Sequence, residues 1–199
     1  MSAKTAVRRF RRVPRVTLGL AIATIAIHAS GIGPDLLYQR SNILHGAIWR
    51  AWTGHFVHFN LSHLFWNLCV FIPAGGWFEL IHPRAARWFY LLSPVFISAV
   101  LLAAEPGLLA YGGLSGVATG ILVCLACSQV GTQSSSPAWF WWGVLVIVAA
   151  KITVESVSGQ AMLVTGIRDV PLAHVAGAAV GVIFGLAARR GGGAERHAG

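Results

Sequence analysis

Long runs of apolar residues constrain the fold of this chain more than any other feature of its sequence. Six such runs occur, at about residues 16–32, 61–80, 88–104, 110–128, 138–154 and 172–188. Each is close to the roughly 20 mostly apolar residues that a helix needs to cross a lipid bilayer. Only 11% of the residues are charged, whereas soluble domains carry about 25%. The sequence therefore predicts an all-α membrane protein whose core is a bundle of six transmembrane helices.

The basic residues flank the apolar runs, although a net charge of +9 could also suggest a nucleic-acid ligand. Lysines and arginines beside spans favour the cytoplasmic side, so we predict the lipid bilayer as a partner and no nucleic acid. We expect residues 1–15 to form a basic cytoplasmic segment, residues 16–188 the membrane domain and residues 189–199 a cytoplasmic tail. A cleaved secretory signal in the first run is the alternative, but it would place that tail outside. The flanking basic residues are Lys4, Arg8, Arg9, Arg11, Arg12 and Arg15, then Arg189, Arg190 and Arg196.

Two polar side chains within these runs are candidates for a catalytic pair. Ser115 lies in the segment Gly113-Leu114-Ser115-Gly116, and His174 lies near the start of the last run. Polar side chains are costly in lipid, which makes each a candidate functional residue. The fourth and sixth runs both enter from the outside. We expect Ser115 about five residues and His174 about three residues into their helices, both roughly 4–8 Å below the outer ends. A serine nucleophile and a histidine base could therefore meet at one depth.

Glycines recur every four residues beside both candidates. Gly112, Gly116 and Gly120 accompany Ser115, while Gly177, Gly181 and Gly185 follow His174. Small residues at this spacing allow helix backbones to approach closely in lipid. The stripes predict a close contact between the two helices. The alternative is that both stripes are ordinary packing seams and that Ser115 is one more small residue.

The second apolar run carries two further polar residues. His63 and Asn67 are four residues apart and therefore share one helical face. Their N–H groups could stabilise the oxyanion that forms during acyl transfer. Interhelical hydrogen bonding is the alternative role.

Other classes of intramembrane protease lack their characteristic residues here. A zinc protease needs a motif such as H-E-x-x-H, and no such glutamate accompanies His55, His58 or His63. An aspartyl protease would need two aspartates within spans, whereas Asp35 and Asp169 fall in loops. We therefore expect neither a metal nor another cofactor.

Four motifs, spread in order over residues 45–188, resemble those of the rhomboid intramembrane serine proteases. The resemblance implies a six-helix core and a serine–histidine dyad. The motifs are Trp49-Arg50 with Thr53, His58, His63 and Asn67; Gly75-Gly76-Trp77-Phe78-Glu79; Gly113-Leu114-Ser115-Gly116; and Ala173-His174 with Gly177, Gly181 and Gly185.

Carried over by position, the resemblance makes Ser115 the nucleophile and His174 the general base. His63 and Asn67, with the backbone N–H of Ser115, become oxyanion donors. The resemblance implies no third carboxylate, and Asp169, five residues before His174, is kept as an alternative orienting residue.

A second carboxylate, Glu155, lies four residues after Lys151 at the outer end of the fifth run. This spacing predicts an ion pair on the surface of a helix. Contact with a substrate tail is the alternative role for these two residues.

The short chain and the segments at residues 52–58 and 111–116 are most similar to the rhombosortase branch of this family. That resemblance implies an endopeptidase of the bacterial inner membrane, with both termini in the cytoplasm and its active site toward the periplasm. The implied substrates are membrane-anchored exported proteins whose C-terminal tail has a glycine-rich stretch, an apolar helix and a basic cluster. A general rhomboid protease with other single-span clients is one alternative. A non-catalytic rhomboid-like protein that binds clients is another.

Overall fold

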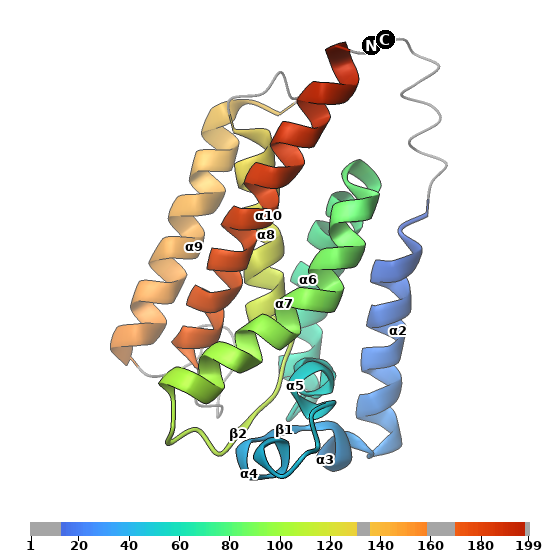
Figure 1. Ribbon diagram of the computed structural model, residues 1–199, viewed down its shortest axis with the longest axis vertical. Coiled ribbons are helices and arrows are strands. Elements are labelled where there is room, and N and C mark those ends of the chain that lie inside the picture. Colours follow the sequence, from blue (N-terminus) through green and yellow to red (C-terminus); the bar gives the residue numbers. More distant parts are fainter. Residues whose placement is uncertain (1–12, 131–135, 159–169, 198–199) are drawn as a thin grey trace.

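The computed structural model describes residues 13–130, 136–158 and 170–197, and it is a bundle of long helices (Figure 1). The long helices are α2 (Arg15–Ser30), α6 (Leu61–Ile81), α7 (Pro83–Ala104), α8 (Ser115–Gln129), α9 (Ala138–Ser158) and α10 (Pro171–His197). The short elements are α3 (Gly33–Leu36), β1 (Tyr38–Gln39), α4 (Arg40–Leu44), α5 (Arg50–Thr53), the 3-10 helix η1 (Gly54–Phe56) and β2 (Ala110–Tyr111).

Among the described residues, four helices are long and apolar enough to cross a membrane: α6, α7, α9 and residues Pro171–Arg189 of α10. The chain is therefore a multi-pass, all-α membrane protein. The apolar helices α2 and α8 have only 16 and 15 residues. At about 1.5 Å per residue they are shorter than the roughly 30 Å hydrocarbon layer. Six complete spans therefore remain a prediction.

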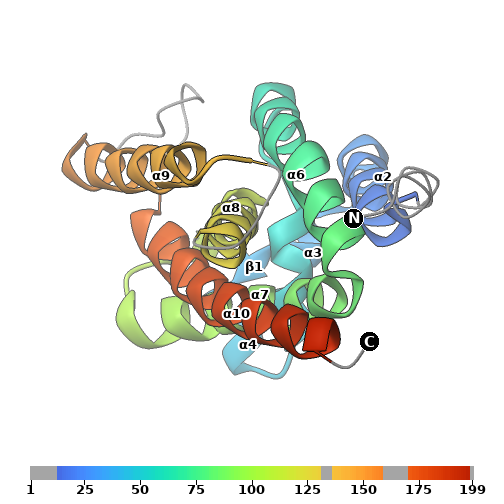
Figure 2. The same ribbon diagram turned by 90° about the horizontal axis from the view of Figure 1, so that it is seen from above.

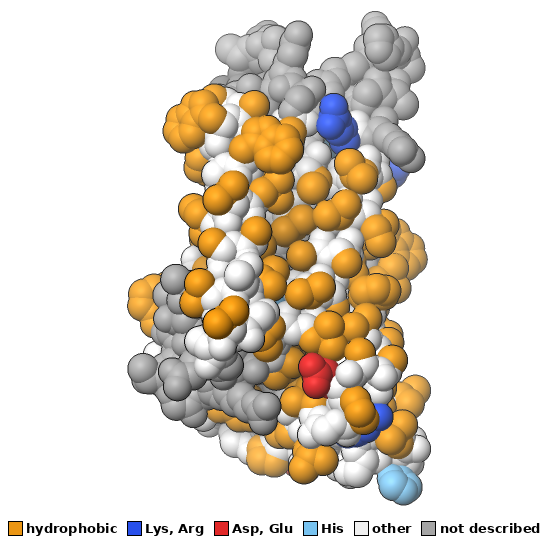
Figure 3. Space-filling model, turned by 90° about the vertical axis from the view of Figure 1, so that its left-hand side faces the viewer, with side chains coloured by type: hydrophobic (Ala, Val, Ile, Leu, Met, Phe, Trp, Pro, Cys, Tyr) orange, Lys and Arg blue, Asp and Glu red, His pale blue; other side chains and the backbone are white. Residues whose placement is uncertain are grey.

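The outer surface of the bundle is apolar, as contact with lipid requires. Large side chains such as Ile22, Leu91 and Ile147 are 66%, 51% and 70% exposed. Figure 3 shows hydrophobic side chains over most of one face, and the charged side chains visible on that face lie toward its ends.

Helix α8 lies at the centre of the bundle, with α6, α9 and α10 around it (Figure 2). Most of its residues are buried, although they are apolar on every side. A helix that is hydrophobic all round belongs in such an interior. The elements that flank α8 therefore decide what its first turn can touch.

Glycines let α8 and α10 pack with their backbones in contact. A Cβ atom on Gly177 would overlap the carbonyl oxygen of Gly116, and one on Gly181 would overlap that of Gly120. Further along, a Cβ on Gly185 would lie 2.7 Å from the carbonyl oxygen of Cys124. The predicted close approach is present. Gly112 is the exception, because it precedes α8 and faces the carbonyl oxygen of Val57.

The fourth apolar run does not form one continuous helix as predicted. Its first residues, Ala110 and Tyr111, pair with β1 instead, with Tyr111 opposite Tyr38. Gly113 then adopts a φ of +124°, a conformation open mainly to glycine. These two features delay the start of α8 until Ser115.

A buried arginine holds the segment that carries β1. Arg50 is 9% exposed, and its Nη1 donates to the carbonyl oxygens of Pro34 and Leu37, each at 2.9 Å, and to Gln39 Oε1 at 3.1 Å. Hydrogen bonds that involve a charged group are among the stronger ones. The strand that positions the residues before Ser115 is thereby fixed to the α3–α5 segment.

Glu79 ties α2 to α6 at the other end of the bundle. Its carboxylate accepts hydrogen bonds from the backbone N–H of Val16 at 3.0 Å and of Thr17 at 2.8 Å, in the first turn of α2. These N–H groups have no partner within their own helix. The Thr17 hydroxyl also lies 2.8 Å from the hydroxyl of Tyr90 on α7. The Gly-Gly-x-x-Glu motif therefore joins three helices.

Candidate active site

Three of the predicted site residues lie in the first turns of three helices that begin at the same end of the bundle (Figure 1). Ser115 is the first residue of α8, His63 the third of α6 and His174 the fourth of α10. His174 lies three residues after the first residue of α10, at the helix position that the sequence predicted. The expectation that Ser115 lies about five residues into its helix is wrong, because Ala110 and Tyr111 form a strand and Gly113 has a positive φ.

The helix contact between α8 and α10 brings the neighbours of Ser115 and His174 together. A Cβ atom on Gly116 would lie 2.9 Å from the carbonyl oxygen of Ala173. Gly116 directly follows Ser115, and Ala173 directly precedes His174. Ser115 is half-buried and His174 is only 1% exposed. The two candidate residues therefore come from the parts of the two helices that touch.

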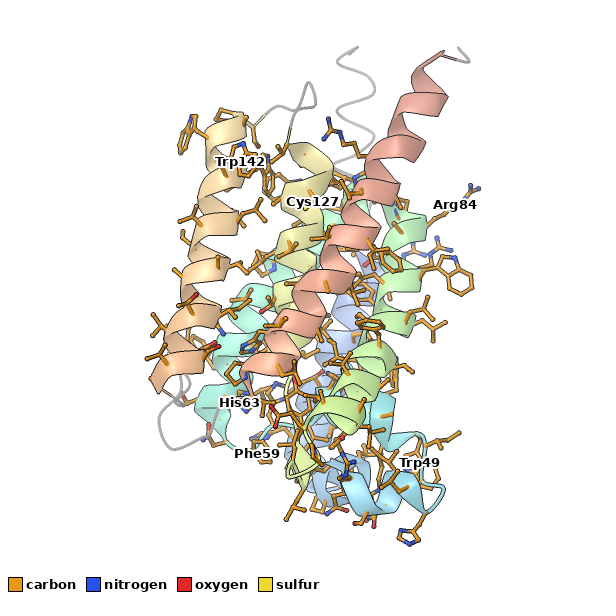
Figure 4. All side chains as sticks on the ribbon, turned by 60° about the vertical axis from the view of Figure 1, so that its left-hand side comes forward. Trp49, Phe59, His63, Arg84, Cys127 and Trp142 are labelled. Carbon is orange, nitrogen blue, oxygen red and sulfur yellow. The ribbon has the colours of Figure 1, made fainter. Side chains whose placement is uncertain are left out.

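The imidazole of His63 packs against the turn that precedes Ser115. A Cβ atom on Gly113 would lie 2.7 Å from the His63 Nε2 and Cε1 atoms, so only glycine fits there. His63 also stacks on Phe59, with ring centroids 6.0 Å apart, and Figure 4 shows both at the same end of the molecule. His63 lies within electrostatic range of His174 as well. It therefore lies beside both candidate residues.

The hydrogen-bonding capacity of α6 at this end is only partly used. Asn67 is 7% exposed, and its Nδ2 donates to the His63 carbonyl oxygen at 2.9 Å. An amide nitrogen has two N–H groups, so one of them remains for another acceptor. The buried His63 Nδ1 has no hydrogen-bond partner among the described residues. Both side chains could therefore donate to an oxygen that a substrate brings.

His58 supports the same turn, a role that the sequence analysis did not assign. The Leu114 backbone N–H lies 3.5 Å from His58 Nε2, which accepts this hydrogen bond, and the His58 ring centroid is 4.8 Å from that of His63. Burial, and next the nearby His63, lower the pKa of His58 to about 3. The ring is therefore neutral at pH 7, as an acceptor must be. In the sequence, the signal for this role of His58 was its spacing from His63.

The imidazole of His174 has a carboxylate and an ammonium beside it, both from α9. Glu155 Oε2 lies 3.1 Å from His174 Nδ1, and Lys151 Nζ lies 3.3 Å from the same nitrogen. The predicted Lys151–Glu155 ion pair is confirmed at 2.5 Å. A contact between Glu155 and this histidine was not predicted from the sequence. Asp169, the alternative, lies outside the described residues.

A second serine–histidine contact lies deeper in the protein. His55 Nε2 is 3.1 Å from Ser98 Oγ, and both residues are 0% exposed. The Ser98 hydroxyl donates to the carbonyl oxygen of Ala51 at 2.6 Å, so it accepts from His55. Burial lowers the pKa of His55 to about 3. This contact joins α7 to the segment before α6 and has no opening to a substrate.

The part of the chain that the structure describes contains no candidate metal site. There, no group of three or more histidine, cysteine, aspartate or glutamate side chains could hold a metal ion. The described groups at this end of the bundle are a hydroxyl, imidazoles, an amide, backbone N–H groups and the Lys151–Glu155 ion pair.

Comparison with known proteins agrees with the motifs and the geometry. No curated protein matches the chain. The family model of the rhomboid domain matches residues 45–191, which includes α6, α8, α9 and the first part of α10 with His174. The chain therefore belongs to the rhomboid family of intramembrane serine proteases.

Proposed function

We propose that the protein is a serine endopeptidase in which Ser115 is the nucleophile and His174 the general base. The observation that carries this assignment is the contact of Gly116 with Ala173. This contact joins the two residues adjacent to the proposed dyad, at the end of the bundle where both helices begin. His174 would take the Ser115 proton as the Ser115 oxygen attacks a peptide carbonyl.

The first turn of α8 supplies the electrostatic part of this mechanism. The N–H groups at the start of a helix have no acceptor within it and carry a partial positive charge. Ser115 occupies that position, so its own N–H can face the oxyanion. His63 and Asn67 would add side-chain donors, each of which lowers the barrier by roughly 2.7–4 kcal/mol in comparable sites. Water, which is available at the membrane surface, would release the acyl-enzyme.

The proposed substrates are exported proteins held in the bacterial inner membrane by a C-terminal tail with a glycine-rich stretch, an apolar helix and a basic cluster. A helix hides its carbonyl groups, and glycine weakens a helix by about 1 kcal/mol per residue relative to alanine. Glycines near the scissile bond would thus help the substrate unwind. The residues of this chain that resemble the rhombosortase branch support this choice. The site would face the periplasm.

A fluorophosphonate probe tests the nucleophile directly. The purified full-length protein should be labelled, and Ser115→Ala should not be, while the variant still accumulates in the membrane. Ser98→Ala serves as the matched control, because Ser98 also contacts a histidine. Equal labelling of the wild type and Ser115→Ala would refute the assignment of Ser115.

A reporter protein tests the substrate class. Its C-terminal tail carries the three proposed parts, and a second reporter replaces the glycine-rich stretch with leucine and alanine. Ser115-dependent cleavage of the first reporter alone supports the rhombosortase-like role. Equal cleavage of both indicates a general rhomboid protease. Binding without cleavage indicates a client-binding protein.

A further inference from the structure

We propose that Glu155 and Lys151 of α9 are positioning residues, and that Glu155 fixes the His174 imidazole in the tautomer that a general base requires. The inference rests on the proposed function, because it assigns these roles relative to His174 as the base. It differs from the two-residue site that the sequence implied, since a third chain element now contributes to the site. Figure 2 shows α9 beside the start of α10.

The contact geometry determines where the imidazole proton lies. Glu155 is 2% exposed, and its Oε2 lies 3.1 Å from His174 Nδ1. An ionised carboxylate can only accept hydrogen bonds. An unprotonated Nδ1 at this distance would set two lone pairs against each other. The Lys151 ammonium lies farther from the same nitrogen, at 3.3 Å, and makes its shorter contact with Glu155 Oε2 at 2.5 Å. The proposed tautomer therefore has the proton of the neutral ring on Nδ1, donated to Glu155, which leaves the Nε2 lone pair as the base.

Lys151 neutralises the carboxylate that orients the ring. Its Nζ lies 2.5 Å from Glu155 Oε2, and its side chain is 26% exposed. A buried, unpaired carboxylate would be strongly unfavourable, so the ammonium favours the ionised form of Glu155. With the imidazole neutral, as a general base requires, the Lys151–Glu155–His174 group carries no net charge. When His174 accepts the Ser115 proton, the new positive charge lies beside the carboxylate.

Among the described residues, two further side chains near this site do not supply this function. His63 on α6 lies within electrostatic range of His174 and can accept or donate, but it carries no charge in its neutral form. The Tyr111 hydroxyl lies 3.3 Å from where a Gly116 Cβ would be, on the side of α8. Neither offers an acceptor that is always ionised. Among these groups, Glu155 is therefore the one whose charge changes least as the reaction proceeds.

A merely structural ion pair would predict a different set of variant properties. If Lys151 and Glu155 only anchored α9 to α10, their replacement would change stability and leave the maximum rate of Ser115 labelling near the wild-type value. If they position and tune His174, Glu155→Gln should lower that rate, and the two replacements should shift its pH dependence in opposite directions. Glu155→Gln leaves an ammonium beside the imidazole, which disfavours its protonation. Lys151→Gln leaves a carboxylate there, which favours protonation.

The test measures the rate of fluorophosphonate labelling of full-length protein in detergent between about pH 5 and 9. Glu155→Gln should lower the maximum rate on the order of 10²- to 10⁴-fold, as loss of the orienting carboxylate does in serine proteases. Its acidic limb should move to lower pH. Glu155→Asp should recover most of the rate. Lys151→Gln should keep a measurable rate with the acidic limb moved to higher pH. Glu105→Gln, at an exposed glutamate, is the matched control.

The outcomes separate this inference from the proposed function. Wild-type rates and an unchanged pH profile in Glu155→Gln and Lys151→Gln would overturn the positioning role, even if labelling still depends on Ser115. Loss of Ser115 dependence in the wild type would instead overturn the proposed function. If Glu155→Gln does not fold, as judged by its melting temperature, Glu155→Asp and Lys151→Gln decide the question through their pH profiles.

Discussion

At the scale of single residues, the protein has one serine–histidine combination in a structural environment, Ser98 with His55, and one in an environment suited to reaction, Ser115 with His174. Ser98 donates its proton to the carbonyl oxygen of Ala51 and is wholly buried with His55. Ser115 is half-buried at the start of a helix. For the reactivity of a serine, its position in the bundle therefore matters more than a nearby histidine. Substitution of the two serines should have opposite effects on labelling.

Ser98→Ala should leave fluorophosphonate labelling intact and lower stability. The substitution removes the acceptor of the His55 N–H and leaves a buried imidazole nitrogen unsatisfied, a loss of about 1–3 kcal/mol. Labelling and the melting temperature in detergent would be measured together. A stable Ser98→Ala protein that no longer reacts with the probe would mean that the wrong serine has been assigned.

The buried imidazoles of His55 and His58 predict a loss of stability in acid. Each has a pKa of about 3 in the fold, against the usual 6.5, so the unfolded chain binds more protons between these values. Stability should be complete above about pH 6.5 and fall by about 1.4 kcal/mol per pH unit for each histidine on the way down. Melting temperatures of Ser115→Ala across this range would show the slope, and His55→Asn should make it shallower. A slope that His55→Asn leaves unchanged would contradict the assignment to His55.

Residue types and spacing predicted Ser115, His174, His63 and Asn67 as a group, because polar residues in apolar runs are conspicuous. The Glu155–His174 contact was not predictable in the same way. The spacing of Lys151 and Glu155 indicated their mutual ion pair, which needs only one helix. Whether that pair faces α10 depends on how α9 is rotated in the bundle, and an almost uniformly apolar helix does not encode that rotation in its pattern.

The glycine contacts between α8 and α10 act at the scale of whole elements. Gly177→Ala would place a methyl group where the Gly116 carbonyl oxygen lies, so the two helices must separate. We expect a loss of about 1–3 kcal/mol in stability and slower labelling of Ser115, since this is the contact beside the proposed dyad.

Gly143→Ala is the control for that change. A Cβ atom there meets nothing within 4 Å, and alanine favours a helix interior over glycine by about 1 kcal/mol. Gly143→Ala should therefore be neutral or stabilising and keep full reactivity. Equal melting temperatures and labelling rates for Gly177→Ala and Gly143→Ala would show that the tight contact is not needed.

Hydropathy did not predict the residue at which α8 begins. Residues 110–114 are apolar enough to extend the run, yet Tyr111 pairs with Tyr38 and Gly113 has a positive φ. Strand pairing depends on a partner more than 70 residues earlier in the chain. The six apolar runs were predictable because each is a local property, whereas this helix boundary depends on a distant contact.

At the scale of the whole molecule, the proposed site and Arg84 lie at opposite ends of the bundle. Figure 4 shows Arg84 and Trp142 toward one end and His63, Phe59 and Trp49 toward the other. The proposed active site lies at the end opposite Arg84. Basic residues favour the cytoplasmic side of a membrane, so the position of Arg84 supports the proposal that the site faces the periplasm.

Single cysteines test that orientation in a background where Cys69, Cys124 and Cys127 are replaced by alanine. Ser41→Cys places an exposed thiol on α4, at the end where the site lies, and Arg84→Cys places one at the other end. A membrane-impermeant maleimide should label Ser41→Cys in intact cells and Arg84→Cys only after the membrane is opened. Arg87 still supplies positive charge beside the substituted Arg84, so the substitution should preserve topology. The reverse pattern would put Ser115 at the cytoplasmic face, where exported proteins with periplasmic cleavage sites could not reach it.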